Sequence, residues 1–154
     1  MPQVYDALNK AWNSTCRVLF GQETAPLSDC AEWLREYDDI LRIEKSAISG
    51  KTVAFSMNEY AARARFIGFD EVHVGKKFAP LGINDMKDIE SVVSAVSERA
   101  AYVGNIVLGN SSNVQNASNV SDSHYVIDST SVADSKYIGY SRYVKESEYC
   151  FGIL

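Results

Sequence analysis

The stretch NVSDSHYVIDSTSVADSKYIGYSRYV, residues 119–144, repeats with a period of three. An aliphatic residue recurs every six positions, and a serine stands midway between each pair. Neither an α-helix, with 3.6 residues per turn, nor a strand, with a period of two, gives this spacing. The aliphatic series extends to Leu108, Val114, Val120, Val126, Val132, Ile138, Val144 and Cys150, and the midway series to Ser111, Ala117, Ser123, Ser129, Ser135, Ser141 and Ser147. Self-similarity at a fixed period is the mark of a solenoid.

Steric requirements predict how this solenoid winds. A tight coil with two flat sides needs an inward aliphatic residue on each side and a small inward residue at each corner. Two sides and two corners, three residues apart, make a coil of twelve residues. Serine hydroxyls at the corners can bond to backbone groups that burial would leave unpaired. Turn-forming Asn or Asp directly precedes a corner residue at Asn116, Asp122, Asp128 and Asp134.

The composition changes near Gly104, after which Ser, Asn, Asp, Tyr and Val dominate. We therefore predict an α+β N-terminal domain over residues 1–104, followed by a β-solenoid domain of about four twelve-residue coils over residues 105–154. Its inward residues are the aliphatic series given above.

The repeat resembles the short β-solenoids of the insect hyperactive antifreeze proteins, which also wind twelve-residue coils with inward residues three apart. The resemblance covers about residues 108–150 and concerns architecture. Those proteins carry paired threonines on one flat side and disulfides across the coil, whereas here the flanks are mixed and Cys150 is the one cysteine of the repeat. The resemblance therefore implies the winding and not ice binding. The alternative is the eighteen-residue coil of hexapeptide acyltransferases, whose small residue comes four after the aliphatic one instead of three.

A twelve-residue coil would align Tyr125, Tyr137 and Tyr149 on one outer face, about 4.8 Å apart. An eighteen-residue coil would instead place Tyr125 beside Tyr143. An outward aromatic face is typical of a protein interface, although such a ladder also stabilises a sheet. The chain then runs EYCFGIL, and its apolar residues either cover the last coil or meet another chain. The hypothetical interface therefore consists of Tyr125, Tyr137, Tyr149, Phe151, Ile153 and Leu154.

Local patterns in the first 104 residues predict both helices and strands. Apolar spacing predicts a helix over residues 3–20 and a short helix over 29–38, capped by Ser28. Extended segments are expected at 50–56 and 64–74. The strongest helical pattern begins at Asn84 and spans 85–101. Its apolar stripe is Met86, Ile89, Val93, Val96 and Ala100, which covers barely two heptads and so favours a core-facing helix over a coiled coil. We expect this half of the chain to cap one end of the solenoid.

Bulk properties limit the classes of function. The formal net charge is −5, which argues against nucleic acid as the main partner. We see no signal peptide and no apolar run of about 18 residues, so no membrane partner is expected. Three cysteines without close spacing do not predict a disulfide framework or a zinc site. The expected location is the reducing cytoplasm or a virion.

Few residues of the sequence suggest a catalytic or ligand-binding role. KSAISGKT, residues 45–52, resembles the end of a phosphate-binding loop, but Lys45 replaces the first glycine and a strand follows where a helix is needed. His73 and His124, the two histidines, are expected to be solvated or stacked. A calcium-binding row of Asp122, Asp128 and Asp134 lacks the glycine-rich loops of calcium-binding rolls. No catalytic residue, cofactor or metal is predicted.

The expected function is therefore non-enzymatic: a structural or assembly protein, acting as a subunit or adaptor of a larger particle. The overall style resembles uncharacterised proteins of large DNA viruses and phages. Partners would be another protein or a second copy, bound through the solenoid face or the C-terminal edge. One alternative is an inhibitor or decoy that binds a host protein through the solenoid face or mimics acidic nucleic acid. Residues 108–154 carry five acidic and three basic side chains, and this small net charge of −2 argues against strong mimicry of nucleic acid. The other alternative is an acyltransferase of the hexapeptide type.

Overall fold

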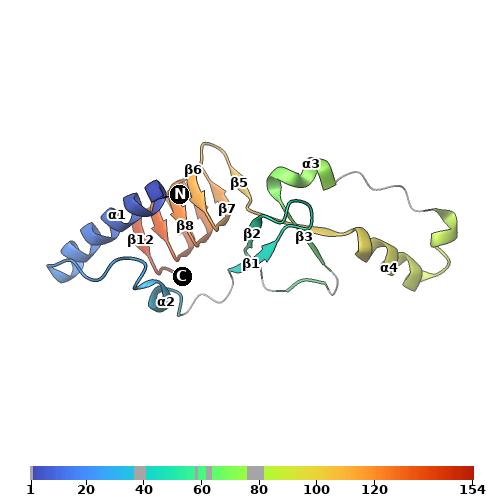
Figure 1. The fold of residues 1–154 in the computed structure, drawn as a ribbon, viewed down its shortest axis with the longest axis horizontal. Helices are drawn as coiled ribbons and strands as arrows, with labels where there is room; N and C mark the ends of the chain where they lie inside the picture. The colour runs from blue at the N-terminus through green and yellow to red at the C-terminus, as the bar shows by residue number, and fades with distance from the viewer. Residues whose placement is uncertain (1, 37–40, 58, 62–63, 76–81) are drawn as a thin grey trace.

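The computed structural model describes residues 2–36, 41–57, 59–61, 64–75 and 82–154 (Figure 1). It shows an N-terminal helix, a region of two small sheets and a C-terminal β-solenoid. The elements before the solenoid are α1 (Pro2–Phe20), α2 (Ala31–Leu34), β1 (Arg42–Lys45), β2 (Thr52–Phe55), β3 (Arg65–Gly68), η1 (Phe69–Glu71), α3 (Val72–Gly75), η2 (Ile83–Asp85), α4 (Ile89–Arg99) and β4 (Ala101–Gly104). The solenoid strands are β5 (Val107–Leu108), β6 (Ser112–Gln115), β7 (Ser118–Ser121), β8 (His124–Ile127), β9 (Thr130–Ala133), β10 (Lys136–Gly139), β11 (Arg142–Lys145) and β12 (Glu148–Phe151).

The predicted solenoid is confirmed. Its strands form two parallel four-stranded sheets, in the orders β12-β10-β8-β6 and β11-β9-β7-β5. In the first sheet Val126 pairs in register with Ile138, and Ile138 pairs with Cys150, so that each coil has twelve residues. Tyr125 accordingly lies beside Tyr137 and not beside Tyr143. The coil therefore differs from the eighteen-residue winding that a hexapeptide acyltransferase would have.

The interior of the solenoid is lined by the predicted aliphatic residues. Its fully enclosed members include Val120, Val126, Val132 and Ile138, each exposed by 1% or less. At both corners, serine hydroxyls join successive coils. Ser123 Oγ donates to the Ser121 carbonyl (2.7 Å) and accepts from the Ser135 amide of the next coil (3.0 Å). Because each hydroxyl is saturated in this way, serine can be buried at a corner without leaving a polar group unpaired.

The period of three has a backbone cause. Every third residue has a φ between 46° and 59°, in the left-handed region, and directly precedes an inward residue. Asn and Asp tolerate this region, whereas other residues with a Cβ adopt it at a cost. The left-handed positions are Asn113, Asn116, Asn119, Asp122, Tyr125, Asp128, Ser131, Asp134, Tyr137, Tyr140, Tyr143, Glu146 and Tyr149. The repeat therefore reflects two requirements, a small or aliphatic inward residue and a tolerant residue before it.

The first coil departs from the predicted series. Val107, not Leu108, pairs with Val120 and packs against the solenoid core. Leu108 points outward and is 48% exposed. An extra residue in the first coil, taken up at a turn where Gly109 has a φ of 61°, shifts the register by one position. Leu108 is thus wrongly placed among the inward residues, because the period of three begins only after this turn.

Helix α1 lies along the solenoid and packs against β8, β10 and β12 (Figure 1). Its apolar side supplies Leu8 and Trp12, which share one core with Ile127 and Phe151 of the solenoid. The segment after the helix turns back along it, and Trp12 Nε1 donates to the Ala25 carbonyl at 2.9 Å. The helix predicted over residues 3–20 is confirmed, and together with α2 it shares a core with the solenoid, not with the small sheets.

The two small sheets lie at the end of the solenoid where β5 begins (Figure 1). Strands β1 and β2 are antiparallel, and β3 and β4 are parallel. Asn105 joins this region to the first coil: its Oδ1 accepts from the Ala54 amide (2.8 Å) and its Nδ2 donates to the Thr52 carbonyl (3.1 Å). Gly104 is required at this junction, since a Cβ there would lie 2.3 Å from the Ala54 carbonyl oxygen. Of the half of the chain that was expected to cap the solenoid, the small sheets thus cover this end, while α1 lies along its side and α4 extends away from it.

The predicted helix over 85–101 is shorter and does not face a core. Helix α4 begins after Asp88, whose Oδ1 accepts from the Ser91 amide at 2.7 Å, and not after Asn84. Its stripe is open to solvent, with Ile89, Val93 and Val96 exposed by 83%, 57% and 51%. The helix extends away from the solenoid, beyond the small sheets (Figure 1). Apolar periodicity establishes that a helix has an apolar face but not that the same chain covers it.

Two further expectations need correction. The extended segment at 64–74 is a strand only over β3, and continues as the helical turns η1 and α3. Of the short helix predicted over 29–38, residues 37 and 38 lie outside the described residues, and within 29–36 only α2 is helical. Helix α2 is preceded by Cys30 without a side-chain cap, while the Ser28 hydroxyl donates to Asp29. Turns this short are stabilised by tertiary contacts more than by local pattern, which explains why their bounds were missed.

Candidate interaction surface

The three tyrosines aligned by the twelve-residue coil form a stacked column, called here the tyrosine ladder. The ring centroids of Tyr125 and Tyr137 are 5.1 Å apart, and those of Tyr137 and Tyr149 are 5.0 Å apart. Tyr125 and Tyr137 are partly buried against the core that α1 shares with the solenoid. Tyr149, at the end of the column, is 43% exposed. The predicted stacking is therefore confirmed, and α1 is one occupant of this face.

A groove runs between α1 and the tyrosine ladder. One part, about 440 Å³ in volume, is lined by Gln3, Asp6, Ala7, Lys10, Ala11 and Ser14 of the helix and by Tyr137 and Tyr149. A second part, about 340 Å³, is lined by Ser14, Thr15, Val18, Leu19 and Tyr149, and its lining is almost wholly apolar. Tyr149 and Ser14 belong to both parts, so the groove is continuous toward the end of the helix.

Helix α1 is longer than the sheet on which it rests. Nineteen residues make a helix of about 28 Å, whereas four strands span only about 14 Å. The helix accordingly extends past β12 (Figure 1). Its last three residues, Val18, Leu19 and Phe20, are exposed by 84%, 68% and 58%. We call these three residues the overhang of α1.

The overhang lies at the end of the solenoid where both sheets have an edge strand, β11 and β12. Of the apolar residues predicted here, Phe151 is buried against Trp12, while Ile153 and Leu154 are 48% and 50% exposed. Tyr149 lines one groove with the overhang, whereas Ile153 lies at the start of β11, where its carbonyl accepts from the Arg142 amide at 2.7 Å. We call the end of the solenoid that carries the overhang, Tyr149, Ile153 and Leu154 the open end. An edge strand such as β12 offers backbone groups to another chain, and the apolar groove beside Tyr149 favours such a contact.

An ion pair fixes α2 to a solenoid corner. Arg35 Nη2 lies 3.0 Å from Asp128 Oδ2, and its guanidinium stands 4.7 Å from the ring centroid of Tyr140. Burial raises the pKa of the Asp128 carboxyl, although Arg35 and Asn116 act in the opposite direction. The contact is structural, since Asp128 is almost fully buried.

The position of Asp128 also shows that the three aspartates considered for calcium binding do not form one row. Asp122 and Asp134 are twelve residues apart and lie at one corner, whereas Asp128 lies at the other. Within the part of the chain that the structure describes, no group of three or more His, Cys, Asp or Glu side chains is placed to hold a metal ion. The three cysteines are free thiols.

His124 meets a serine, a contact that sequence reasoning did not predict. Its Nδ1 lies 2.8 Å from Ser112 Oγ, on the solvent side of the first sheet. The neighbour of His124 on its other side in the register is Lys136, where a hydrolase triad would need a carboxylate. Ser112, His124 and Lys136 therefore form a column of polar side chains across successive strands. His73, in α3, is solvent-exposed.

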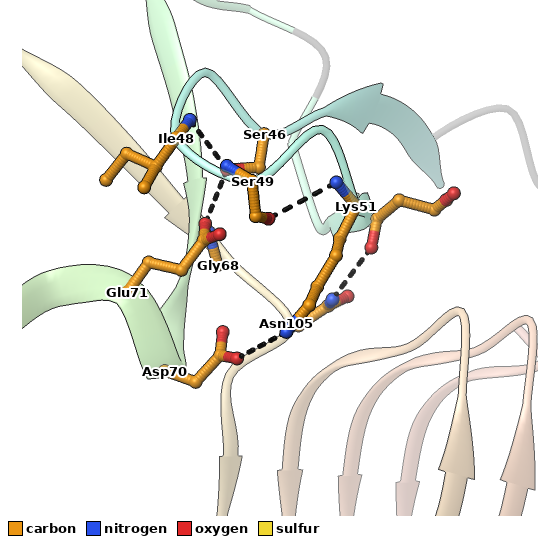
Figure 2. Close-up of polar contacts among 9 residues, drawn as sticks. Ser46, Ile48, Ser49, Lys51, Gly68, Asp70, Glu71 and Asn105 are labelled. Atoms are coloured by element: carbon orange, nitrogen blue, oxygen red, sulfur yellow. Dashed lines mark hydrogen bonds and ion pairs between the residues drawn. The ribbon is translucent and has the colours of Figure 1, made fainter.

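The segment KSAISGKT forms the turn between β1 and β2, and its amides are already occupied (Figure 2). Ser46 Oγ accepts from the amides of Ile48 (3.0 Å) and Ser49 (3.2 Å), and the Gly50 amide donates to the Ser46 carbonyl (3.0 Å). A phosphate-binding loop instead leaves its amides directed at the ligand. The structure therefore supports the interpretation as a turn before a strand.

The same turn holds a buried carboxylate, which sequence reasoning missed. Glu71 Oε2 accepts from Ser46 Oγ (2.5 Å) and from the Gly68 amide (2.7 Å) (Figure 2). These hydrogen bonds, with that of the Ser46 hydroxyl the largest, lower the pKa of Glu71 below its ordinary value, while burial acts in the opposite direction. Glu71 therefore ties the β1–β2 turn to β3. Its contact with Ser46 could not be predicted from a local pattern, because the two residues are 25 apart in the sequence.

No protein-family model matches the chain, and no curated protein or solved structure shows significant similarity to it. Among the described residues, no helix is both long and apolar enough to cross a membrane.

Proposed function

We propose that this protein is a non-enzymatic structural or assembly protein, a subunit or adaptor of a larger particle such as a virion. The observation that carries the proposal is the gathering of exposed apolar side chains at the open end. There the overhang of α1 lines an apolar groove with Tyr149 of β12, and the exposed Ile153 lies at the start of β11. An apolar groove beside the edge strand β12 suits the addition of another chain by strand pairing.

The distribution of polar groups supports the same interpretation. The enclosed corner hydroxyls of the solenoid form hydrogen bonds with its own backbone. In the turn at residues 45–52, backbone amides are likewise hydrogen-bonded within the turn. The half-buried His124 has Ser112 and Lys136 as its neighbours in the adjacent coils. The groove beside the tyrosine ladder ends at Tyr149 and Leu19, and this end is apolar. The surface is thus suited to contact with a protein more than to the binding of a charged small molecule.

Light scattering tests the proposal over a wide concentration range. We expect the chain to associate, and a triple substitution at the open end, Phe20→Ser with Ile153→Ser and Leu154→Ser, to weaken association at least about tenfold. The matched control is Met57→Ser with Val74→Ser and Ile83→Ser, which also removes three exposed apolar side chains but leaves the open end intact. A chain that is monomeric at every concentration would count against the proposal. So would equal association of the two variants.

A further inference from the structure

Side chains of successive coils align in columns along the first sheet, and each column ends at β12. The first strand positions are Ser112, His124, Lys136 and Glu148, the second positions include the tyrosine ladder, and the third positions include Val126, Ile138 and Cys150. The edge strand β12 therefore presents a carboxylate, a phenol ring and a thiol in succession. A strand added in the same register would extend each of these three columns by one side chain.

The backbone of β12 is directed at the same edge. In the inner coils, the amide of the first strand residue donates to the carbonyl of the corner serine one coil further on. His124 donates to Ser135 in this way, and Lys136 donates to Ser147, both at 3.0 Å. By the same geometry the amide of Glu148 is directed away from β10, where an added parallel strand would supply the carbonyl.

Three of the four positions of β12 are open to a partner. Glu148 and Tyr149 are exposed, and Cys150 is half-buried. The fourth position is closed, since Phe151 is buried against Trp12 of α1. A partner strand can therefore place one side chain beside each of the first three residues of β12.

The apolar part of the groove lies one step beyond Tyr149. A helix rises about 1.5 Å per residue and coils are about 4.8 Å apart, so that one coil corresponds to about three residues of α1. The part of the groove beside both Tyr137 and Tyr149 is lined by helix residues as far as Ser14, whereas the apolar part beside Tyr149 extends to Leu19. An aromatic ring placed there would continue the tyrosine ladder, stacked on Tyr149 and in contact with Leu19.

The first column indicates the charge of the partner. Lys136 lies between His124 and Glu148 in the register, so the next side chain of the column would lie directly beside the Glu148 carboxylate. Opposite charges at directly paired positions stabilise a sheet, whereas like charges destabilise it. Within one strand, Lys136 Nζ also stands 4.9 Å from the ring centroid of Tyr137. Both relationships favour a basic residue followed by an aromatic one.

Building on the assembly role proposed above, we propose that β12 binds an extended segment of a partner protein in which a basic, an aromatic and an aliphatic residue follow one another. The segment adds to β12 as a parallel strand. Its basic side chain lies beside Glu148, and its aromatic ring enters the groove between Tyr149 and Leu19. Its aliphatic side chain covers Cys150, which ends the inward column of the sheet. Strand β10, which pairs with β12 from the other side, begins with the same order of side chains, KYI.

Fluorescence anisotropy with labelled hexapeptides tests this order of side chains. The peptide SKYIGS, which follows β10, should bind the chain. The peptide SEYIGS should bind at least about threefold more weakly, because it places a like charge beside Glu148. The peptide SYKIGS has the same composition as SKYIGS but exchanges the ring and the charge. It should bind at least about tenfold more weakly, because its ring no longer reaches the groove.

Variants of the chain locate the contact. E148K should reverse the preference, so that SEYIGS binds more tightly than SKYIGS, whereas E59K, the same change between β2 and β3, should leave the preference as it is. Y149S should weaken the binding of SKYIGS at least about tenfold. Y143S, the same change at a side chain of β11 that is 72% exposed, should leave binding unchanged. Because Glu148 and Tyr149 are exposed, E148K and Y149S should unfold at the same temperature as the unmodified chain, as measured by circular dichroism.

The outcomes separate the partner segment from the assembly role. Tighter binding of SKYIGS than of SEYIGS and SYKIGS, with reversal by E148K, supports the segment. Equal binding of SKYIGS and SYKIGS, or binding that survives Y149S, overturns it. A chain that associates in light scattering but binds none of the peptides overturns the segment alone and makes a second copy the occupant. A monomeric chain that binds SKYIGS in the expected order supports the segment and counts against self-association, and a chain that neither associates nor binds overturns both.

Discussion

Trp12 and Phe151 meet edge to face, with ring centroids 5.4 Å apart and an interplanar angle of 74°. One belongs to the first helix and the other to the last strand, so the contact joins the two ends of the described chain. Gly139 makes room for it, since a Cβ there would lie 3.1 Å from Phe151 Cδ1. The solenoid is thus supported along one face by a helix that precedes it by about a hundred residues.

The two tryptophans offer a matched test of this contact. Trp12→Ala should lower the free energy of unfolding by about 3–5 kcal/mol, because it empties a site that is 5% exposed between α1 and the solenoid. Trp33→Ala, at a site that is 62% exposed, should change it by less than about 1 kcal/mol. Urea titration followed by circular dichroism measures both. Equal losses would show that α1 does not hold the solenoid through Trp12.

A charged substitution tests whether Val132 faces the interior of the solenoid. Val132→Asp should unfold the solenoid, at a cost above about 4 kcal/mol, because it buries an unpaired carboxylate at a site that is 1% exposed. Ser131→Asp adds the same charge one position earlier, where the side chain points outward and the left-handed backbone tolerates Asp. That control should stay folded, as judged by the strand signal in circular dichroism. A folded V132D chain would contradict the inward assignment.

The left-handed backbone predicts a stabilising substitution. Glu146 has a φ of 48° in a column whose other members are Asp122 and Asp134. Glu146→Asp keeps the charge and introduces a residue that tolerates this conformation, so it should raise the free energy of unfolding by up to about 1 kcal/mol. Glu148→Asp makes the same chemical change at a position of ordinary φ and should give no gain. Thermal unfolding measures the stability of both variants. An equal change in stability in the two would show that the left-handed backbone at Glu146 does not destabilise the fold.

The buried Glu71 predicts a pH dependence. Because its pKa is lowered in the folded chain, its contribution to stability is complete above its ordinary value of 4.5 and is lost as the pH falls through the folded value. Ser46→Ala removes its strongest hydrogen bond and should cost about 1–3 kcal/mol near neutral pH. The difference from the unmodified chain should shrink below about pH 4.5, as measured by urea unfolding between pH 7 and pH 3. A difference that does not vary with pH would show that Ser46 does not act through the carboxylate.

Much of the fold could be predicted because it depends on the spacing of residue types over short distances in the sequence. Val126, Ile138 and Cys150 had to align once the coil length was known, and the tyrosine ladder followed from the same number. The Asn and Asp before the corner residues predict turns, and the structure shows that the same left-handed backbone also precedes the aliphatic residues of the flat sides. Leu108 was misplaced because a single extra residue at a glycine turn shifts every later register without disturbing the period.

The sequence by itself therefore determined the twelve-residue coil, its inward residues and its outward tyrosines, because each depends on neighbours at a fixed short separation. Only the tertiary structure decided what lies against them. An amphipathic pattern states that a helix has an apolar side but not which surface will cover it. The stripe of α1 is buried against the solenoid, whereas that of α4 remains exposed. The overhang of α1 and the groove at Tyr149 arise from the difference between a helix of about 28 Å and a sheet of about 14 Å, which no local pattern contains.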